Sequence, residues 1–110
     1  MNKPFFVHFV LELKAASTTQ NEENALLDKI NGWLTQLNLV VVNECEHRFT
    51  PIGLSKVFIL STSHLALHTW PENTFAHIDL VCCDKNVTLD KVKDASNAFF
   101  GDSLLSLKQI

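Results

Sequence analysis

The stretch Leu54–Cys83, LSKVFILSTSHLALHTWPENTFAHIDLVCC, decides how the rest of the chain folds. Its apolar, β-branched and aromatic residues fall into three runs of strand length, which are Leu54–Leu60, His64–Trp70 and Phe75–Cys83. The polar break Ser61–Ser63 separates the first two runs, and Pro71 stops the second. The stretch therefore predicts three consecutive strands.

Three further segments have strand character. Phe5–Leu13 is apolar and rich in aromatic residues, and Leu39–Asn43 is a β-branched run that could continue to Phe49. The tail Ser103–Ile110 carries enough apolar residues for a last short strand. With the central stretch, the chain is expected to supply six strands.

Two segments show the spacing of amphipathic helices. In the first, apolar residues recur every three or four positions, at Leu26, Leu27, Ile30, Trp33, Leu34 and Leu37. Ser17, Thr18 and Thr19 offer helix starts before it, and Gly32 lies inside it. In the second, Thr88 is a candidate N-cap and Gly101 a candidate C-terminal stop, with an apolar stripe at Leu89, Val92, Ala95, Ala98 and Phe99.

The order strand, helix, several strands, helix, strand predicts an α+β fold. We expect a two-layer sandwich, an antiparallel sheet with both helices on one face, built as a single domain over residues 1–110. The other face of such a sheet needs a cover. A partner subunit is the obvious candidate, so we expect a homodimer.

Charge and composition exclude several classes of partner. The net charge is -3 and the nine basic residues are spread along the chain, so we expect neither nucleic-acid binding nor a polybasic membrane patch. The apolar N-terminal segment is too short to span a bilayer and lacks a signal-peptide cleavage site. We therefore expect a cytoplasmic protein that binds no membrane. Three cysteines are too few for a disulfide framework, and adjacent Cys82 and Cys83 would point to opposite faces of a strand.

Two kinds of active site fit the polar residues of the middle third poorly. His64 and His68 have the spacing of metal ligands, with Glu72, His77 and Asp79 as further candidates, but the set matches no known metal motif, and we predict no metal. A serine–histidine–carboxylate triad would need a nucleophile elbow. Gly-x-Ser-x-Gly is absent, and the chain has only three glycines.

Three motifs between Glu46 and Cys83 point to a different chemistry. They are His47-Arg48-Phe49, Pro51-Ile52-Gly53-Leu54-Ser55 and Ser63-His64-Leu65-Ala66-Leu67-His68-Thr69-Trp70-Pro71-Glu72, followed by Ala76, Asp79 and Cys83. In this order they resemble the prokaryotic-type S-adenosylmethionine decarboxylase proenzymes, which depend on a pyruvoyl group. The resemblance is strong over about forty residues and consists mostly of hydrophobic pattern over the rest.

The resemblance implies a proenzyme that cleaves itself between Thr62 and Ser63 and converts Ser63 into the pyruvoyl cofactor. In this scheme His68 is the base, Ser55 donates a hydrogen bond to the oxyanion of the intermediate, and Cys83 later returns a proton to the substrate. The pyruvoyl carbonyl would take the substrate amine as a Schiff base and act as an electron sink. These four residues, Ser55, Ser63, His68 and Cys83, are the expected catalytic set.

The resemblance also implies how a small-molecule substrate is held. Phe49 or Trp70 would stack on the adenine or the sulfonium of S-adenosylmethionine, and Glu72 would accept hydrogen bonds from the ribose hydroxyls. These side chains could come from the opposite subunit. The product would supply aminopropyl groups for spermidine synthesis.

Thr62 stands where the family usually has a glutamate, and this departure supports two alternatives. In one, the chain decarboxylates another amino acid, such as ornithine or arginine. In the other, it stays uncleaved and inactive, with a binding or regulatory role. Taken singly, each of these residues could also be an ordinary turn serine, strand histidine or core aromatic residue.

The alternation of a strand places one condition on this scheme. Ser63 and His68 are five residues apart, so on a regular strand their side chains face opposite sides of the sheet. The scheme therefore requires Ser63 to lie just before the strand, or a bulge between the two residues.

Overall fold

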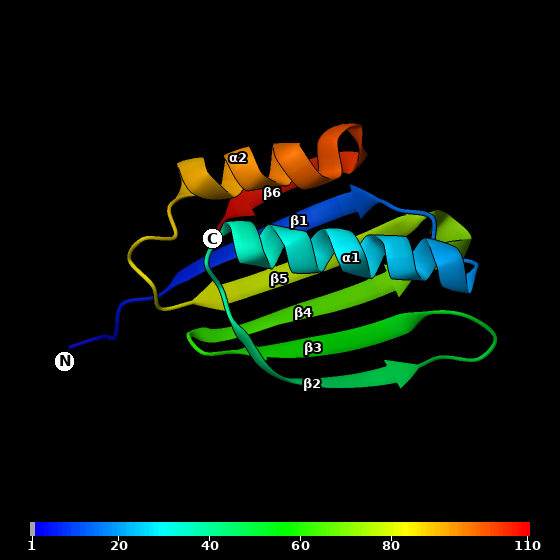
Figure 1. Ribbon diagram of the computed structural model, residues 1–110, viewed down its shortest axis with the longest axis horizontal. Coiled ribbons are helices and arrows are strands. Elements are labelled where there is room, and N and C mark those ends of the chain that lie inside the picture. The colour runs from blue at the N-terminus through cyan, green and yellow to red at the C-terminus, as the bar shows by residue number, and fades with distance from the viewer. Residues whose placement is uncertain (1) are drawn as a thin grey trace.

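The computed structural model of the protein describes residues 2–110. It contains β1 (Val7–Lys14), α1 (Gln20–Gln36), β2 (Val41–Arg48), β3 (Leu54–Leu60), β4 (Ser63–Trp70), β5 (Phe75–Cys82), α2 (Leu89–Phe100) and β6 (Leu104–Gln109). The six strands form one sheet in the order β2-β3-β4-β5-β1-β6, and every neighbouring pair is antiparallel. Both helices lie on the same side of the sheet (Figure 1). The predicted α+β two-layer fold is therefore confirmed.

The hydrophobic core lies between the helices and one face of the sheet. Alternate strand residues are fully buried there, among them Phe9, Leu11, Phe58, Leu65, Leu67, Ile78 and Leu80. The helices contribute Leu26, Ile30, Trp33, Leu34, Val92, Ala95 and Phe100. Because side chains alternate along a strand, the residues between them point to the opposite face, which no helix covers. This uncovered face is called the open face below.

The two helices begin where side chains cap their first turns. The Thr19 hydroxyl accepts a hydrogen bond from the backbone N–H of Glu22, and the Glu22 carboxylate accepts from Thr18 and Thr19. Hydrogen bonds from Thr18 and Thr19 lower the pKa of the Glu22 carboxyl. This capping box moves the start of α1 to Gln20, ahead of the first apolar residue of the stripe. Thr88 caps α2 in the same way by accepting from the Lys91 N–H.

Strand pairing corrects several of the predicted boundaries. β4 begins at Ser63 rather than His64, β5 ends at Cys82 rather than Cys83, and β6 is Leu104–Gln109, one residue shorter at each end. β1 begins at Val7 rather than Phe5, because Val7 pairs with Cys82, the last residue of β5, and Phe5 and Phe6 have no strand beside them. β2 begins at Val41 rather than Leu39 and continues to Arg48, since β3 pairs with it along its whole length. Leu54–Leu60 matches its predicted range without change.

Gly32 of α1 packs against the Phe99 ring of α2. A Cβ atom at this position would lie 2.4 Å from Cε1 of Phe99, which is far inside van der Waals contact. Gly32→Leu should therefore lower the free energy of unfolding by about 1–3 kcal/mol, although leucine favours the helix intrinsically. Urea unfolding measures the effect. The exposed neighbour Asn31→Ala is the control and should stay within about 0.5 kcal/mol; equal effects from both variants would contradict this packing.

Candidate functional site

A shallow pocket lies on the open face at the end of β4 that carries Trp70. It is lined by Phe49, Ile52, Gly53, Ser55, His68, Thr69, Trp70 and Glu72. All three predicted substrate-binding residues and two of the four predicted catalytic residues are therefore neighbours. Phe49 and Trp70 are 50% and 44% exposed, so their rings are open to a ligand.

Ser55 and His68 form a direct pair in this pocket. They are register partners on β3 and β4, and the Ser55 hydroxyl shares a hydrogen bond of 2.7 Å with Nδ1 of His68. Both side chains are partly buried, and the chain neighbours Leu54, Leu67 and Thr69 are buried under the helices. The pair therefore faces the open side, with one imidazole nitrogen engaged by Ser55.

Thr62, Ser63 and Cys83 meet at the opposite end of the sheet. The carbonyl oxygen of Thr62 accepts two hydrogen bonds from Cys83, one from the backbone N–H at 2.9 Å and one from the thiol at 3.2 Å. Two donors on one carbonyl draw electron density from its carbon, which favours attack by a nucleophile. This is the carbonyl of the Thr62–Ser63 peptide bond.

Ser63 has an unusual backbone conformation. It is the first residue of β4, and its φ of 141° lies in a region that residues other than glycine rarely adopt. Ser63 thus belongs to the strand rather than preceding it, and the pairing of β4 with β3 and β5 shows no bulge between Ser63 and His68, so neither of the two expected conditions is met within one chain. The hydroxyl of Thr62 is buried without a hydrogen-bond partner, so it is not tied to any described group.

The residues around Ser63 and Cys83 do not meet the Ser55–His68 pair within one chain. Ser63 is at one end of an unbroken ladder between β4 and β5, and His68 lies near the other end, two residues before Trp70. Five residues of strand separate them by about 16 Å. The described chain therefore holds two half-sites, one around Ser63 and Cys83 and one around Ser55 and His68.

The adjacent cysteines differ in exposure, although only Cys82 belongs to β5. Cys82 is fully buried under the helices, and burial raises the pKa of its thiol. Cys83 is exposed and its thiol contacts the Thr62 carbonyl. Only Cys83 can act on a molecule at this end of the sheet.

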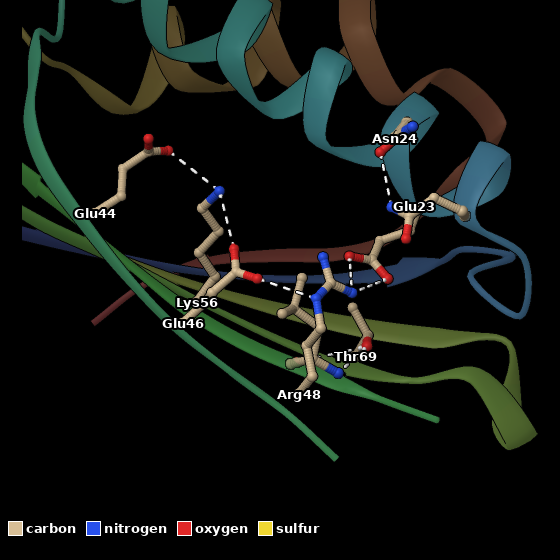
Figure 2. A network of polar contacts seen from close by, with 9 residues as sticks. Glu23, Asn24, Glu44, Glu46, Arg48, Lys56 and Thr69 are labelled. Carbon is tan, nitrogen blue, oxygen red and sulfur yellow. Dashed lines mark hydrogen bonds and ion pairs between the residues drawn. The ribbon is translucent and has the colours of Figure 1, made fainter. Parts of the chain in front are cut away.

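Arg48 of the His-Arg-Phe motif points away from the pocket. Its guanidinium bonds Glu23 of α1 at 2.7–3.0 Å and Glu46 at 3.1 Å, and Lys56 joins Glu46 to Glu44 (Figure 2). These groups lie on the helix-facing side of β2 and β3, beyond the part of the sheet that the helices bury. Individual ion pairs at a surface stabilise little, so the network mainly fixes where β2 lies relative to α1.

Sequence reasoning missed that the Ser55–His68 pair belongs to a longer polar row. Direct register partners cross the whole sheet on the open face in the order His47, Ser55, His68, His77, Glu12 and Ser106. Each residue sits on the polar side of its own strand's alternation, which the sequence displays. The register that aligns them is not visible in the sequence, because it depends on the turns between neighbouring strands and on how β1 pairs with β5 and β6, which lie far from it in the chain.

Within residues 2–110, no three histidine, cysteine, aspartate or glutamate side chains gather as a possible metal site. His64 and His68 share the open face of β4, and His64 is exposed. No helix formed by these residues is long and apolar enough to cross a membrane.

Residues 7–110 match the family model described as S-adenosylmethionine decarboxylase. An S-adenosylmethionine decarboxylase proenzyme of Clostridium botulinum is 30% identical over 79 residues, covering 71% of this chain and 68% of the relative. The proenzyme of Fervidobacterium nodosum is 49% identical over 47 residues, and that of Pseudomonas aeruginosa LESB58 is 44% identical over 48. These two matches cover 43–44% of this chain but only 34% and 30% of the relatives' own lengths, about a third.

The solved structure of the adenosylmethionine decarboxylase from Aquifex aeolicus VF5 has the same fold. It superposes with a TM-score of 0.69 and 20% sequence identity, covering 99% of this chain and 89% of that one. The likeness extends over the whole sheet and both helices. At this identity it concerns the fold alone.

Proposed function

Because the chain belongs to the S-adenosylmethionine decarboxylase family, we propose that it is a self-cleaving proenzyme whose mature form decarboxylates S-adenosylmethionine. The observation that carries the proposal is the pair of hydrogen bonds from Cys83 to the Thr62 carbonyl. They activate the one peptide bond at which the family resemblance puts cleavage.

The chemistry of cleavage needs only groups of the chain. The Ser63 hydroxyl attacks the Thr62 carbonyl carbon, the C–N bond breaks, and the hydroxyl proton passes to the freed Ser63 amine, leaving an ester. A base then removes the Ser63 α-proton and the Thr62 carboxylate departs. The dehydroalanine takes up water, loses ammonia and becomes the pyruvoyl group. The strained φ of Ser63 supports this scheme, since cleavage relieves the backbone constraint.

The base has to come from a second copy of the chain. His68 lies about 16 Å along β4 from Ser63 in its own chain, too far for proton transfer. Two copies can pack open face to open face around a two-fold axis that crosses the strands. This packing places the Ser55–His68 end of one copy over the Ser63–Cys83 end of the other. Exposed apolar side chains on this face, including Ile59 and Trp70, give such a homodimer surface to bury.

In the dimer, the Ser55 hydroxyl would donate a hydrogen bond to the oxyanion formed from the Thr62 carbonyl, beside the donors of Cys83. His68 would remove the α-proton of Ser63. Each complete site of the homodimer would thus combine one half-site from one copy of the 110-residue domain with the other half-site from its symmetry partner.

The residues at the cleavage site fit the pyruvoyl group that the family implies. The serine that becomes the group is the first residue of β4, and the exposed thiol of Cys83 contacts the carbonyl of the preceding residue, Thr62. When formed, the group supplies an electron sink for loss of carbon dioxide. Cys83 then holds a proton for the substrate α-carbon, a role that requires the thiol form.

The pocket on the open face supplies the contacts that would hold S-adenosylmethionine. Trp70 lies 5.7 Å from the Phe75 ring, and Phe49 lies 4.8 Å from the His47 ring, so both exposed aromatic faces are braced from one side. A sulfonium or an adenine can stack on either face. Glu72 at the rim is exposed and free to accept hydrogen bonds from ribose hydroxyls. Decarboxylation of this substrate would give a product that supplies aminopropyl groups for spermidine synthesis in the cytoplasm.

The substrate assay separates this proposal from its alternatives. Purified protein should release carbon dioxide from S-adenosylmethionine at least tenfold faster than from ornithine or arginine at equal concentration, because only the first has an adenine and a ribose to engage Trp70 and Glu72. Glu72→Gln should raise KM several-fold for S-adenosylmethionine. A preference for ornithine or arginine would contradict the substrate assignment while leaving self-cleavage intact, and intact chains with no activity would favour the uncleaved homologue.

A further inference from the structure

The connection between β2 and β3 carries one of the two exposed aromatic rings of the candidate substrate pocket. It runs from Phe49 to Gly53 and closes on itself through a 2.9 Å hydrogen bond from the Phe49 N–H to the Gly53 carbonyl. Gly53 also lies against the Phe49 side chain, because a Cβ atom added to Gly53 would lie 3.5 Å from Cβ and 3.6 Å from Cδ2 of Phe49. The Phe49 ring and the connection therefore form one unit.

A small cavity separates this unit from the start of α1. It has a volume of about 180 Å³ and is lined mostly by polar residues, with residues 17–20 and Glu23 on the helix side and Arg48 and residues 49 and 51–53 on the other. The first turn of α1 thus faces the connection across a gap. A side chain that crosses the gap can fix the connection to the helix.

The ion pair between Arg48 and Glu23 crosses this gap (Figure 2). Arg48 is the last residue of β2 and directly precedes Phe49. Its Nη1 lies 2.7 Å from one oxygen of the Glu23 carboxylate and 3.0 Å from the other. Within residues 2–110, this pair is the one side-chain contact by hydrogen bond or ion pair between α1 and residues 48–53. The Glu23 side chain is only 12% exposed, so water competes for it less than at an open surface.

We propose that Arg48 and Glu23 are positioning residues that hold the Phe49 ring where it receives the substrate. A partly exposed ion pair is weak, so its loss leaves the connection in place for only part of the time. The apparent affinity for a ligand falls by the fraction of molecules that are ready to bind it, here about two- to fivefold. The inference rests on the proposed function, since it takes Phe49 as a substrate contact.

Substrate affinity can be measured without cleavage in Ser63→Ala protein. The fluorescence of Trp70 should report binding of S-adenosylmethionine, because Trp70 is exposed in the pocket and Trp33 is fully buried in the core. Adding Glu23→Ala should raise the Kd about two- to fivefold.

The same titration distinguishes the pair from its single members. Arg48→Ala should raise the Kd as much as Glu23→Ala does, and the two changes together should raise it no further, because both remove the same contact. Glu46→Ala is the matched control. It removes the other carboxylate bound to Arg48, which belongs to β2 itself and does not reach α1, so it should leave the Kd unchanged.

Two further readouts separate positioning from a general loss of structure. In a Phe49→Ala background, Glu23→Ala should have no further effect on the Kd, because the pair acts through that ring. Hydrogen exchange needs no ligand at all. The Phe49 N–H, which bonds the Gly53 carbonyl, should exchange about two- to fivefold faster in Glu23→Ala, while the amides of β3 keep their rates.

These measurements can fail separately. An unchanged exchange rate of the Phe49 N–H in Glu23→Ala would overturn the inference, and so would an unchanged Kd or an equal rise of the Kd in the Phe49→Ala background. If Ser63→Ala protein does not bind S-adenosylmethionine, that result counts against the proposed substrate. The exchange rate of the Phe49 N–H then decides the positioning role by itself.

Discussion

Ser63→Ala is expected to leave the whole protein as one uncut chain of 12.4 kDa. The alanine has no hydroxyl to attack the Thr62 carbonyl, so neither the ester nor the pyruvoyl group can form. Mass spectrometry of the purified protein should show complete loss of the fragments 1–62 and 63–110. Decarboxylation should fall to background together with cleavage.

The control for this variant lies two residues away. Ser61 is exposed in the same turn and its backbone N–H bonds the Val40 carbonyl, which Ser61→Ala preserves. Ser61→Ala should therefore cleave like wild type. Fragments from the Ser63→Ala protein would mean that another residue is the nucleophile, and loss of cleavage in both variants would point to a disturbed turn.

A mixture of two inactive variants should recover cleavage. In the proposed dimer, Ser63 of one copy meets His68 of the other, because about 16 Å separates the two residues within a chain. Ser63→Ala and His68→Ala proteins should each stay uncut alone. When co-expressed, a mixed dimer contains one complete site, made by Ser63 of the His68→Ala chain and His68 of the Ser63→Ala chain. The His68→Ala chain should then be cut, and the Ser63→Ala chain should not.

Distinguishing the two chains requires only a tag of different mass on each. Cleavage of the His68→Ala chain at the wild-type rate when alone would show that His68 is not the base. If the co-expressed chains stay uncut although both proteins sediment as dimers, the result would contradict a site shared between copies. Ser55→Ala can replace His68→Ala as a second partner, since both residues belong to the same half-site.

The strands of this fold were predictable because their residues alternate or cluster in ways that burial requires. Leu54–Leu60 needed no correction, since buried Leu54, Phe58 and Leu60 and the turns at each end mark it clearly. The start of β1 was placed two residues early because Phe5 and Phe6 are apolar, yet a strand ends where its partner ends. The start of α1 depends on capping hydrogen bonds rather than on the apolar stripe.

The candidate site, like the fold, was only partly predictable from the sequence. The motif identified Phe49, Trp70 and Glu72, and the pocket brings them beside Ser55 and His68. The sequence placed Ser63 at the start of β4 but left open a turn or a bulge between Ser63 and His68, and the regular pairing of β4 with its neighbours removes both. The sequence also could not align His77 with His68, which depends on the register of β4 and β5.

The intact mass of the freshly purified wild-type protein is the decisive measurement of self-cleavage at Ser63. Two fragments are expected, residues 1–62 and residues 63–110. The second should be lighter by one ammonia than simple hydrolysis would give, because a pyruvoyl group replaces its N-terminal serine. A single species of 12.4 kDa that persists on incubation would contradict the account.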